Sequence, residues 1–353
     1  MTHLELLQLL TLTPGISGHE GAIRQIMKDE LGLLAPSIED RLGQIAFSFG
    51  KVDIPKILFL GHMDEIGFIV AGFTDSGLLK VHNIGGWDPR TALSSPVTVI
   101  TNQGKFPGIF SSVPVHHQKK DSPPSKLEIE DLCVDIGAKN KQDVIDNYGI
   151  QLGDQIIPVC HSFYNKKSGR FFSKAFDNRV GVGSAIELGK AIAGKELPNT
   201  VVCGGSVQEE VGLRGASIFT NLVKPDVAFI VEGPPADDTI PSEGQCKLDA
   251  GVQVRLFDPT MIVPKGLSDY VIATAKDAGI PIQLTVRRRG GTDAGRVHLT
   301  HQGIPSIVLG VPVRYAHSHN GVISMADYDN LIKLMIRIAE TFDKSVLEQV
   351  IKG

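Results

Sequence analysis

The sequence predicts an α/β fold, in which helices cover both faces of a mostly parallel sheet, with a small β-barrel domain inserted into the chain. From Phe172 onward, strand-like apolar runs alternate with helix-like runs, a pattern typical of parallel sheets. Between residues 68 and 165 the pattern changes to short β-like runs separated by turns rich in Gly, Pro, Asn and Asp, which favours a small barrel. A length of 353 residues leaves room for both parts.

Two helices and a buried strand are predicted for the first part of the chain. The leucine-rich N-terminus fits an amphipathic helix in which Thr2 and Glu5 form a capping box. Ser17 and Glu20 repeat this spacing and predict a second capped helix, whose apolar residues recur at helical intervals. The apolar run at 56–60 predicts a buried strand that ends in the segment GHMD.

The inserted domain is predicted from β-like runs, together with a loop rich in proline, histidine and lysine at 114–126. The runs lie at 68–73, 97–101, 105–110, 132–136 and 154–159. These limits assign residues 1–67 and 166–353 to the larger domain and residues 68–165 to the barrel. We expect the barrel to carry the contacts of an oligomer, because a domain of about 95 residues buries only part of its apolar surface by itself.

The remaining elements alternate along the chain. The pattern predicts helices at 179–193, 265–279 and 293–302, strands at 200–207, 226–231, 282–287 and 305–311, and a long C-terminal helix capped by Ser324. Because parallel strands end at the same edge of a sheet, ligands in such folds bind beyond that edge. The residues that follow each strand are therefore the candidates for function.

Composition and charge exclude several classes of function. The chain has 35 basic and 39 acidic side chains, and its basic clusters (Lys119–Lys120, Lys166–Lys167, Arg287–Arg289) are short, so we expect no nucleic acid partner. No apolar run reaches the roughly 18 residues that span a bilayer, so we expect no membrane partner. The cysteines form no CxxC pair and the N-terminus lacks a secretion signal, so we expect a cytoplasmic protein.

Histidines and carboxylates follow the predicted strands. They are His62 and Asp64, Glu209 and Glu210, Glu232, and His317 and His319, with Asp177 just before a helix. Imidazole and carboxylate ligands suit zinc, cobalt or manganese, and a carboxylate can bridge two ions. Two ions about 3.5–4 Å apart would activate a water and polarise a carbonyl.

Each of these residues also has an ordinary structural interpretation. A His-x-Asp pair can stabilise a turn, Asp177 can cap a helix, and a Glu–Glu pair can lie on a solvated surface. Their joint occurrence at the strand ends of one sheet favours the metal site. The glycine-rich segment at 290–295 is either a tight turn capped by Asp293 or a close approach to a ligand. It is neither a phosphate loop nor a dinucleotide fingerprint, and the chain has no GxSxG motif.

These residues lie in motifs that resemble those of the dinuclear zinc aminopeptidases, which include the glutamyl and the tetrahedral (TET) aminopeptidases. Some members of that family carry the label cellulase or endoglucanase. The similar stretches are GHMDEIGFIV at 61–70, GGWDPR at 85–90, IEDLCVDIGA at 129–138, KAFDNRVG at 174–181, VQEEVGLRGA at 207–216, RGGTDAG at 289–295 and RYAHSH at 314–319. They keep the family's order over nearly the whole chain.

The resemblance implies a zinc exopeptidase-like domain with an inserted β-barrel, and it implies roles for single residues. His62 and Glu232 would bind one metal, Glu210 and His317 the other, and Asp177 both. Asp64 would orient His62 through a hydrogen bond, and Glu209 would act as the general base. The family also implies self-association, in many members a tetrahedral dodecamer built through the inserted domain.

Three positions depart from the family pattern. Glu232 stands where many relatives have Asp, Gly321 stands where relatives usually have Glu, and the segment 255–264 lacks a glycine-rich stretch. The segments 255–264 and 318–321 bear on substrate preference and on whether activity is kept.

We therefore interpret the sequence as that of an aminopeptidase that releases N-terminal residues from short peptides with two divalent ions. Zinc is the expected metal, and cobalt and manganese are the alternatives. The other hypotheses are an amide deacylase with the same metals, a glycosidase, and a non-catalytic relative. A glycosidase needs two carboxyl groups facing each other across about 5–9.5 Å, which the adjacent Glu209 and Glu210 are poorly placed to provide.

Overall fold

The computed structural model describes residues 1–114, 116, 127–240 and 244–352. Lys119–Lys120 and most of the predicted loop at 114–126 lie outside the described residues. The chain divides into two compact units. The larger unit comprises residues 1–65, 162–316 and 321–353, and the smaller one comprises residues 66–161 and 317–320.

A nine-stranded mixed sheet forms the centre of the larger unit. Its strand order is β1 (Ser37–Glu39), β2 (Ile45–Phe49), β12 (Thr200–Ser206), β3 (Lys56–His62), β13 (Val227–Glu232), β17 (Ser306–Gly310), β14 (Val252–Asp258) and β15 (Met261–Ile262), with β16 (Ile282–Val286) beside β14. The central strands β12, β3, β13 and β17 are parallel, whereas β2 runs antiparallel to β12 and β14 runs antiparallel to β17. Their carboxyl ends therefore meet at one edge.

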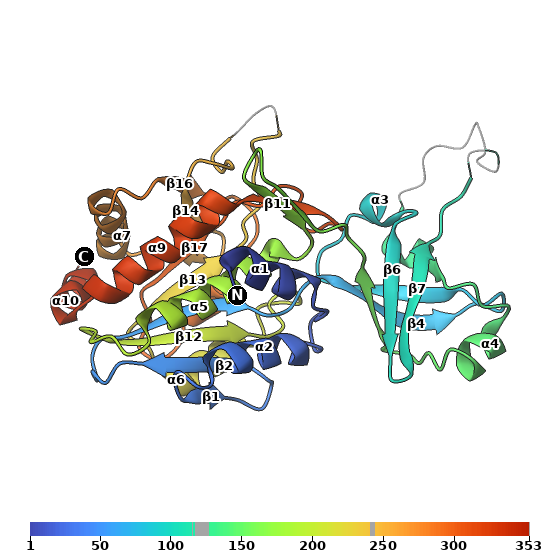
Figure 1. Ribbon diagram of the computed structural model, residues 1–353, viewed down its shortest axis with the longest axis horizontal. Helices are drawn as coiled ribbons and strands as arrows, with labels where there is room; N and C mark the ends of the chain where they lie inside the picture. Colours follow the sequence, from blue (N-terminus) through green and yellow to red (C-terminus); the bar gives the residue numbers. More distant parts are fainter. Residues whose placement is uncertain (115, 117–126, 241–243, 353) are drawn as a thin grey trace. The chain divides into compact units, whose positions relative to one another are not determined.

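Helices cover both faces of this sheet, which confirms the predicted fold class. In β3, Ile57 and Phe59 pack into a core under α5 (Phe176–Ile192) and α9 (Met325–Thr341), which lie side by side in Figure 1. The alternate residue Leu58 packs on the opposite face under α6 (Ala216–Val223) and α8 (Ala294–Val297). Because both faces are buried, the central strands are apolar at nearly every position.

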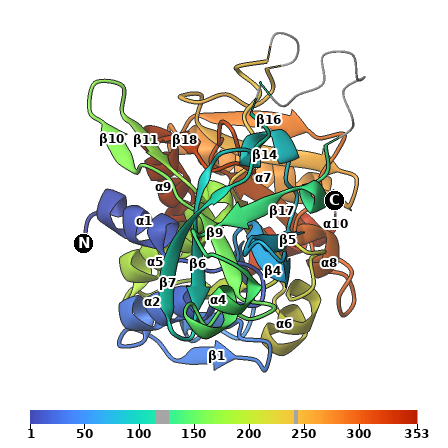
Figure 2. The same ribbon diagram turned by 90° about the vertical axis from the view of Figure 1, so that its right-hand side faces the viewer.

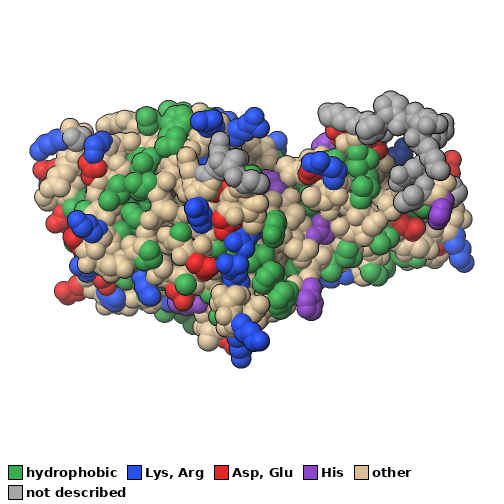
Figure 3. All heavy atoms as spheres, turned by 90° about the horizontal axis from the view of Figure 1, so that it is seen from above, with side chains coloured by type: hydrophobic (Ala, Val, Ile, Leu, Met, Phe, Trp, Pro, Cys, Tyr) green, Lys and Arg blue, Asp and Glu red, His purple; other side chains and the backbone are tan. Residues whose placement is uncertain are grey.

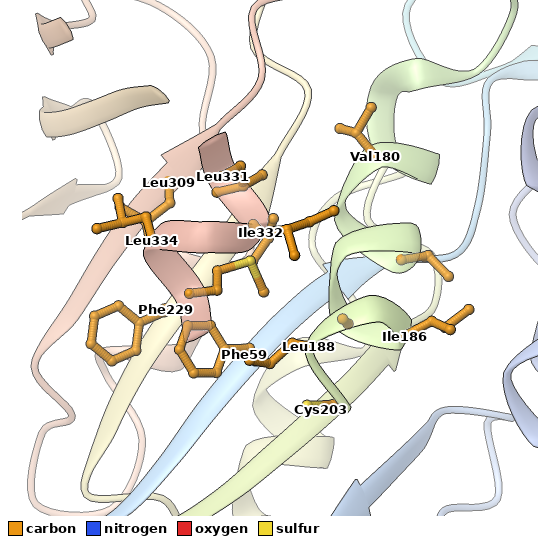
Figure 4. Close-up of a cluster of buried hydrophobic side chains, with 14 of the residues drawn as sticks. Phe59, Val180, Ile186, Leu188, Cys203, Phe229, Leu309, Leu331, Ile332 and Leu334 are labelled. Carbon is orange, nitrogen blue, oxygen red and sulfur yellow. The ribbon is translucent and has the colours of Figure 1, made fainter. Parts of the chain in front are cut away.

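The core between the sheet and α9 is built from aromatic and branched side chains. Phe59 and Phe229 stack with ring centroids 4.9 Å apart. Figure 4 shows both rings below Leu331, Ile332 and Leu334 of α9. This close packing fixes the helices against the sheet. The candidate site lies at the edge of that sheet.

The remaining elements of the larger unit lie outside the central sheet. They are the helices α1 (His3–Leu12), α2 (Gly21–Leu31), α7 (Lys265–Asp277) and α10 (Lys344–Lys352), and a three-stranded sheet of β10 (Phe163–Asn165), β11 (Arg170–Ser173) and β18 (Gly321–Ser324). Within the described ranges, no helix has both the length and the apolar character needed to cross a bilayer.

On the face shown in Figure 3, basic and acidic side chains are interspersed.

The smaller unit is a closed barrel, as predicted. Its strands follow the order β4 (Gly67–Phe73), β5 (Leu79–Ile84), β8 (Cys133–Asp135), β7 (Gly104–Phe110), β6 (Pro96–Thr101) and β9 (Gln155–Pro158), and Figure 2 shows them wrapped around one another. Phe68 packs against both Trp87 and Phe110 inside the barrel, with centroids 4.7 Å apart in each pair. The short helices α3 (Pro89–Ala92), η2 (Ile129–Asp131) and α4 (Lys141–Asp146) lie in its connections.

The N-terminal capping predictions have opposite outcomes. Thr2 and Glu5 form the predicted capping box of α1. The second prediction is wrong, because α2 begins at Gly21 without any side-chain cap from Glu20, and Ser17 donates its hydroxyl hydrogen to Asp64 instead. The local spacing is that of a cap, but the side chains have partners elsewhere in the fold.

Other predicted elements differ in extent. The predicted helix at 293–302 is only the short α8 (Ala294–Val297), and the long C-terminal helix is two helices, α9 and α10. Ser324 precedes α9 but makes no side-chain cap bond. Eight described strands are additional to the prediction: β1, β2, β5, β10, β11, β14, β15 and β18. They are short or contain polar residues. β1 pairs with β2 and β5 with β4, which are neighbours in the sequence, and β2 also pairs with β12, which is distant in the sequence.

Candidate metal centre

The carboxyl ends of three neighbouring strands place the first candidate residues. His62 is the last residue of β3 and lies opposite Ser206, the last residue of β12. Glu232 ends β13, whose register with β3 pairs Ile230 with Leu60 and so brings Glu232 to the level of His62. The register of a parallel sheet thus sets an imidazole beside a carboxylate.

Asp177 reaches this edge from the start of α5, where the backbone leaves helical geometry at φ −82° and ψ 103°. Its Oδ1 lies 3.0 Å from His62 Nε2. The neighbouring Asn178 donates from Nδ2 to the carbonyl oxygen of Val231 at 2.6 Å, which ties the start of the helix to β13. The helix approaches β3 so closely that a Cβ on Gly61 would lie 2.7 Å from a backbone atom of Gly181.

The two glutamates follow β12 in a turn of the backbone. Glu209 Oε2 lies 3.8 Å from His62 Nε2. The buried carboxylate of Asp64 accepts the backbone N–H groups of both Glu209 and Glu210, each at 3.1 Å. Asp64 therefore connects the segment after β3 with the segment after β12.

The hydrogen bonding of His62 selects the nitrogen that faces the carboxylates. Its Nδ1 lies 3.1 Å from the main-chain oxygen of Asp64 and 3.4 Å from Oδ1 of the same residue. Since a carbonyl oxygen only accepts, Nδ1 carries the hydrogen and donates it, which leaves Nε2 of a neutral ring free to bind a metal. Asp64 thus contacts the ring mainly through its backbone.

Two overlapping groups within the larger unit have the composition and spacing of metal ligands. They are His62, Glu209 and Glu210, and His62, Asp177 and Glu232, and within each group the ligand atoms lie within 4.8 Å of one another. Glu232 Oε2 lies 3.8 Å from His62 Nε2, and its Oε1 is buried without a hydrogen-bond partner in the described part of the chain. A buried carboxylate oxygen of this kind suits a cation.

The electrostatics of the cluster also fit a cation. Burial and the charge of Asp177 raise the pKa of Glu232 to about 8, and burial raises the pKa of Glu209 well above its usual value. Burial alone would lower the pKa of His62, but the charge of Glu209 and the hydrogen bond with Asp177 raise it well above its usual value. A divalent ion would offset the repulsion between these carboxylates, so the residues fit a metal.

His317 lies in the segment 317–320, which belongs to the smaller unit. Its backbone has φ 58°, and its Nδ1 lies 2.8 Å from the carbonyl oxygen of Gly86. Because a carbonyl oxygen only accepts, Nδ1 carries the hydrogen. In a neutral ring Nε2 then keeps its lone pair, as in His62. His319 packs edge-on against Trp87 in the same unit, and burial lowers its pKa to about 4.

Two buried polar groups near the site were not predicted. Asp293 is the N-cap residue of α8, but its side chain makes no cap bond; it accepts a hydrogen bond from Ser206 Oγ at 2.5 Å instead, and burial raises its pKa to about 6. Glu65 forms ion pairs with the buried Lys174 and Arg179 on either side of Asp177. The sequence motifs around these residues could have marked them as candidates. Their partners could not be predicted, because a buried ion pair between distant segments leaves no periodic pattern in a sequence.

The layered fold with helices on both faces of the sheet and the ligand groups at its edge are those of a metal-dependent hydrolase. Comparison with known proteins makes the class more specific: residues 43–334 match the family model described as M42 glutamyl aminopeptidase. The chain is 35 % identical over 324 residues to a glutamyl aminopeptidase of Lactococcus lactis subsp. cremoris, an alignment that covers 90 % of each protein. The chain belongs to the M42 glutamyl aminopeptidase family.

Solved structures agree with this assignment. The TET aminopeptidase of a marine sediment archaeon of the Thaumarchaeota superposes with a TM-score of 0.95 at 36 % identity, covering 99 % of both chains. The TET1 peptidase of Pyrococcus horikoshii superposes with a TM-score of 0.87 at 30 % identity, covering 96 % of this chain and all of the other. The protein is a metal-dependent aminopeptidase, which confirms the predicted family and activity over the deacylase, glycosidase and non-catalytic alternatives.

Proposed function

We propose that this aminopeptidase releases N-terminal residues from short peptides with two divalent ions, zinc in the first place and cobalt or manganese as alternatives. The observation that carries the proposal is the group of His62, Asp177 and Glu232, in which one oxygen of Glu232 is buried without a hydrogen-bond partner in the described residues. The donor atoms are nitrogen and oxygen only, which suits these metals.

The proposed ligands divide into two sets. His62 and Glu232 would hold one ion, Glu210 and His317 the other, and Asp177 both. The proximity of Asp177 and Glu232 to His62 Nε2 supports the first set, and the contact of His317 Nδ1 with the Gly86 carbonyl oxygen, which puts the hydrogen of a neutral ring on Nδ1, is compatible with the second. When bound, two divalent ions would lower the pKa of the attacking water and polarise the scissile carbonyl.

We assign the proton transfers to Glu209. Its carboxylate would take the proton of the attacking water and pass it to the departing amine, and it lies beside His62 without being one of the five proposed ligands. Asp64 would orient His62 and hold the backbone of both glutamates. The hydrogen bonds of Asp64 to the N–H groups of Glu209 and Glu210 support this role.

Metal removal tests the proposal. Dialysis against a chelator should abolish the hydrolysis of aminoacyl substrates, and zinc, cobalt or manganese should restore it, because this donor set discriminates weakly between these ions. Peptides with free and with acetylated N-termini form the matched substrates, and only the free amines should be cleaved. Full activity in protein shown to contain less than one ion per chain would contradict the proposal.

We also propose that copies of this chain assemble into a closed shell, a tetrahedral dodecamer, through the inserted domain of residues 68–165. The TET1 peptidase of Pyrococcus horikoshii forms a tetrahedron or a large octahedral shell, which supports the idea. Ile109, Leu152 and Val159 are exposed apolar residues of the barrel unit and are candidates for the contact. Light scattering tests the assembly, and a monomeric protein at micromolar concentration would overturn it.

The compartment proposed for the protein is the cytoplasm. The four cysteines, all of them among the described residues, form no disulfide: they are Cys133, Cys160, Cys203 and Cys246. Free thiols are typical of a reducing compartment. Fractionation of cells of the source organism, with activity followed in each fraction, tests this location.

A further inference from the structure

We propose that Ser17 and Glu20 are positioning residues that hold the turn carrying Glu209 and Glu210. The proposal rests on the role assigned above to Glu209. Its starting point is the predicted capping box, which the structure does not form: neither side chain caps α2. Both side chains instead reach the segments that follow β3 and β12.

The turn after β12 begins in a strained conformation. Gln208 has φ 57°, in the left-handed region that side chains other than glycine seldom adopt. Such a conformation persists only where surrounding contacts impose it. The carbonyl oxygens of Gln208 and Glu209 accept hydrogen bonds from Arg214 and Leu213 within the same turn. Its N–H groups need partners from elsewhere.

Three consecutive N–H groups of this turn donate to buried carboxylates. Gln208 donates to Oε1 of Glu20 at 3.2 Å, and Glu209 and Glu210 donate to the two oxygens of Asp64 at 3.1 Å each. Bonds from N–H groups to carboxylates are stronger than those between neutral groups. Glu20 and Asp64 together thus fix the backbone directions from which the two glutamate side chains leave.

The segment 17–20 completes this support. Ser17 Oγ donates to Asp64 Oδ2 at 2.6 Å, so it holds the carboxylate that receives Glu210. Glu20 Oε1 also accepts the N–H of Gly18 at 2.9 Å, which fixes the glutamate within its own loop. Glu20 is buried, with 6 % of its surface exposed. A short N-terminal segment therefore acts on the position of the proposed general base through the backbone.

A purely structural role for Glu20 makes a different prediction. If Glu20 only supported the start of α2, its loss would lower the unfolding temperature while the folded enzyme kept its kcat. Asp327 provides the matched control, because it is also a buried carboxylate that accepts two backbone N–H groups, those of Asp249 and Gly251. Neither of those residues belongs to the ligand groups around His62.

The experiment compares Glu20→Ala, Glu20→Gln and Asp327→Ala in the full-length protein. We expect Glu20→Ala to lower kcat by roughly 10–100-fold, since a displacement of about 1 Å in a reacting group costs about that much. KM and the metal content should stay near those of the unchanged enzyme. Glu20→Gln should recover most of the rate, because its amide oxygen still accepts N–H bonds. Asp327→Ala should lower the unfolding temperature and leave kcat unchanged.

Hydrogen exchange and a double variant give independent readouts. Exchange at the amides of residues 208–210 should be faster in Glu20→Ala and unaltered in Asp327→Ala. In a Glu209→Gln background, Glu20→Ala should cause little further loss, because the group it positions is already inactive. Ser17→Ala should resemble Glu20→Ala in direction, and Ser17→Thr should restore the hydroxyl and the rate.

Three results would overturn the proposal: unchanged exchange at 208–210 in Glu20→Ala, an unchanged kcat in that variant, or a full additional loss in the Glu209→Gln background. Failure of the proposed base is a separate outcome. In that case Glu209→Gln itself keeps its activity, whereas exchange at 208–210 still reports whether Glu20 holds the turn.

Discussion

Gly61→Ala should move helix α5 away from strand β3 and so weaken metal binding without changing any proposed ligand. An added Cβ would lie 2.7 Å from the backbone carbon of Gly181 and 2.9 Å from its Cα and from the nitrogen of Val182. Carbon atoms in contact normally stay about 3.5–4.0 Å apart, so the two elements must separate by about 1 Å. No side-chain rotation can relieve this clash, because a Cβ is fixed by its own backbone and the atoms it meets are backbone atoms.

The consequence for the site follows from the position of Asp177. Its Oδ1 lies 3.0 Å from His62 Nε2, and it belongs to the same helix as Gly181. Metal–ligand distances tolerate only about 0.2 Å, so a shift of about 1 Å takes Asp177 out of range. We expect lower metal occupancy and a loss in kcat of about 10²-fold. Overpacking should also lower the free energy of unfolding by about 1–3 kcal/mol.

The assay measures metal content, kcat and thermal unfolding on the same preparations. Gly21→Ala is the matched control, because a Cβ at Gly21 would meet no atom within 4 Å and the residue is exposed at the start of α2. We expect this control to keep its metal, its kcat and its stability. If Gly61→Ala retains full metal content and an unchanged kcat, the close approach of α5 does not position Asp177 and the reasoning is refuted.

Three further predictions concern carboxylates. Glu209→Gln should lose about 10²–10⁴-fold in kcat with its metals retained, whereas Glu210→Gln should lose metal and recover part of its rate in excess metal. Metal stoichiometry and kcat measured on both variants test this assignment, and the reverse pattern would exchange the two roles. Asp177→Ala should be the most damaging ligand substitution, because it removes a donor from both ions; measured metal content equal to that of the other ligand variants would contradict this. Burial raises the pKa of Asp327 to about 6, so its contribution to stability is complete below about pH 4 and is lost as the pH rises through 6. The difference in unfolding free energy between the unchanged protein and Asp327→Asn should therefore shrink by about 3 kcal/mol between pH 4 and pH 7 in chemical denaturation, and a pH-independent difference would exclude the shift.

Sequence alone determined the features that depend on local pattern. The apolar runs that became β3, β12, β13 and β17 are continuous because both of their faces are buried, and this property is visible without any knowledge of their partners. The short β-like runs and frequent turn residues between 68 and 165 indicated the barrel, because turn residues are also a local feature of the sequence. The positions of His62 and Glu232 at strand ends followed directly, since a strand's last residue is a local feature.

Only the tertiary structure decided how those residues meet. The register between β3 and β13 sets Glu232 beside His62, and the small size of Gly61 and Gly181 lets α5 bring Asp177 to them. Neither feature has a local signal, because register and helix approach depend on contacts between segments far apart in the chain. The proposed metal roles of these residues stay predictions until metal content is measured.

Ser17 and Glu20 show most directly that local spacing does not determine hydrogen-bond partners. Their spacing is the same whether they cap a helix or reach across the fold, because in both cases a side-chain oxygen lies near backbone N–H groups. Thr2 and Glu5 form the cap, since α1 begins at His3 directly after Thr2, whereas α2 begins at Gly21, four residues after Ser17. Ser17 and Glu20 instead bond to Asp64 and Gln208, which the folded sheet brings within reach. Sequence determined which groups could form hydrogen bonds, and the long-range packing of β3 and β12 decided which partners they have.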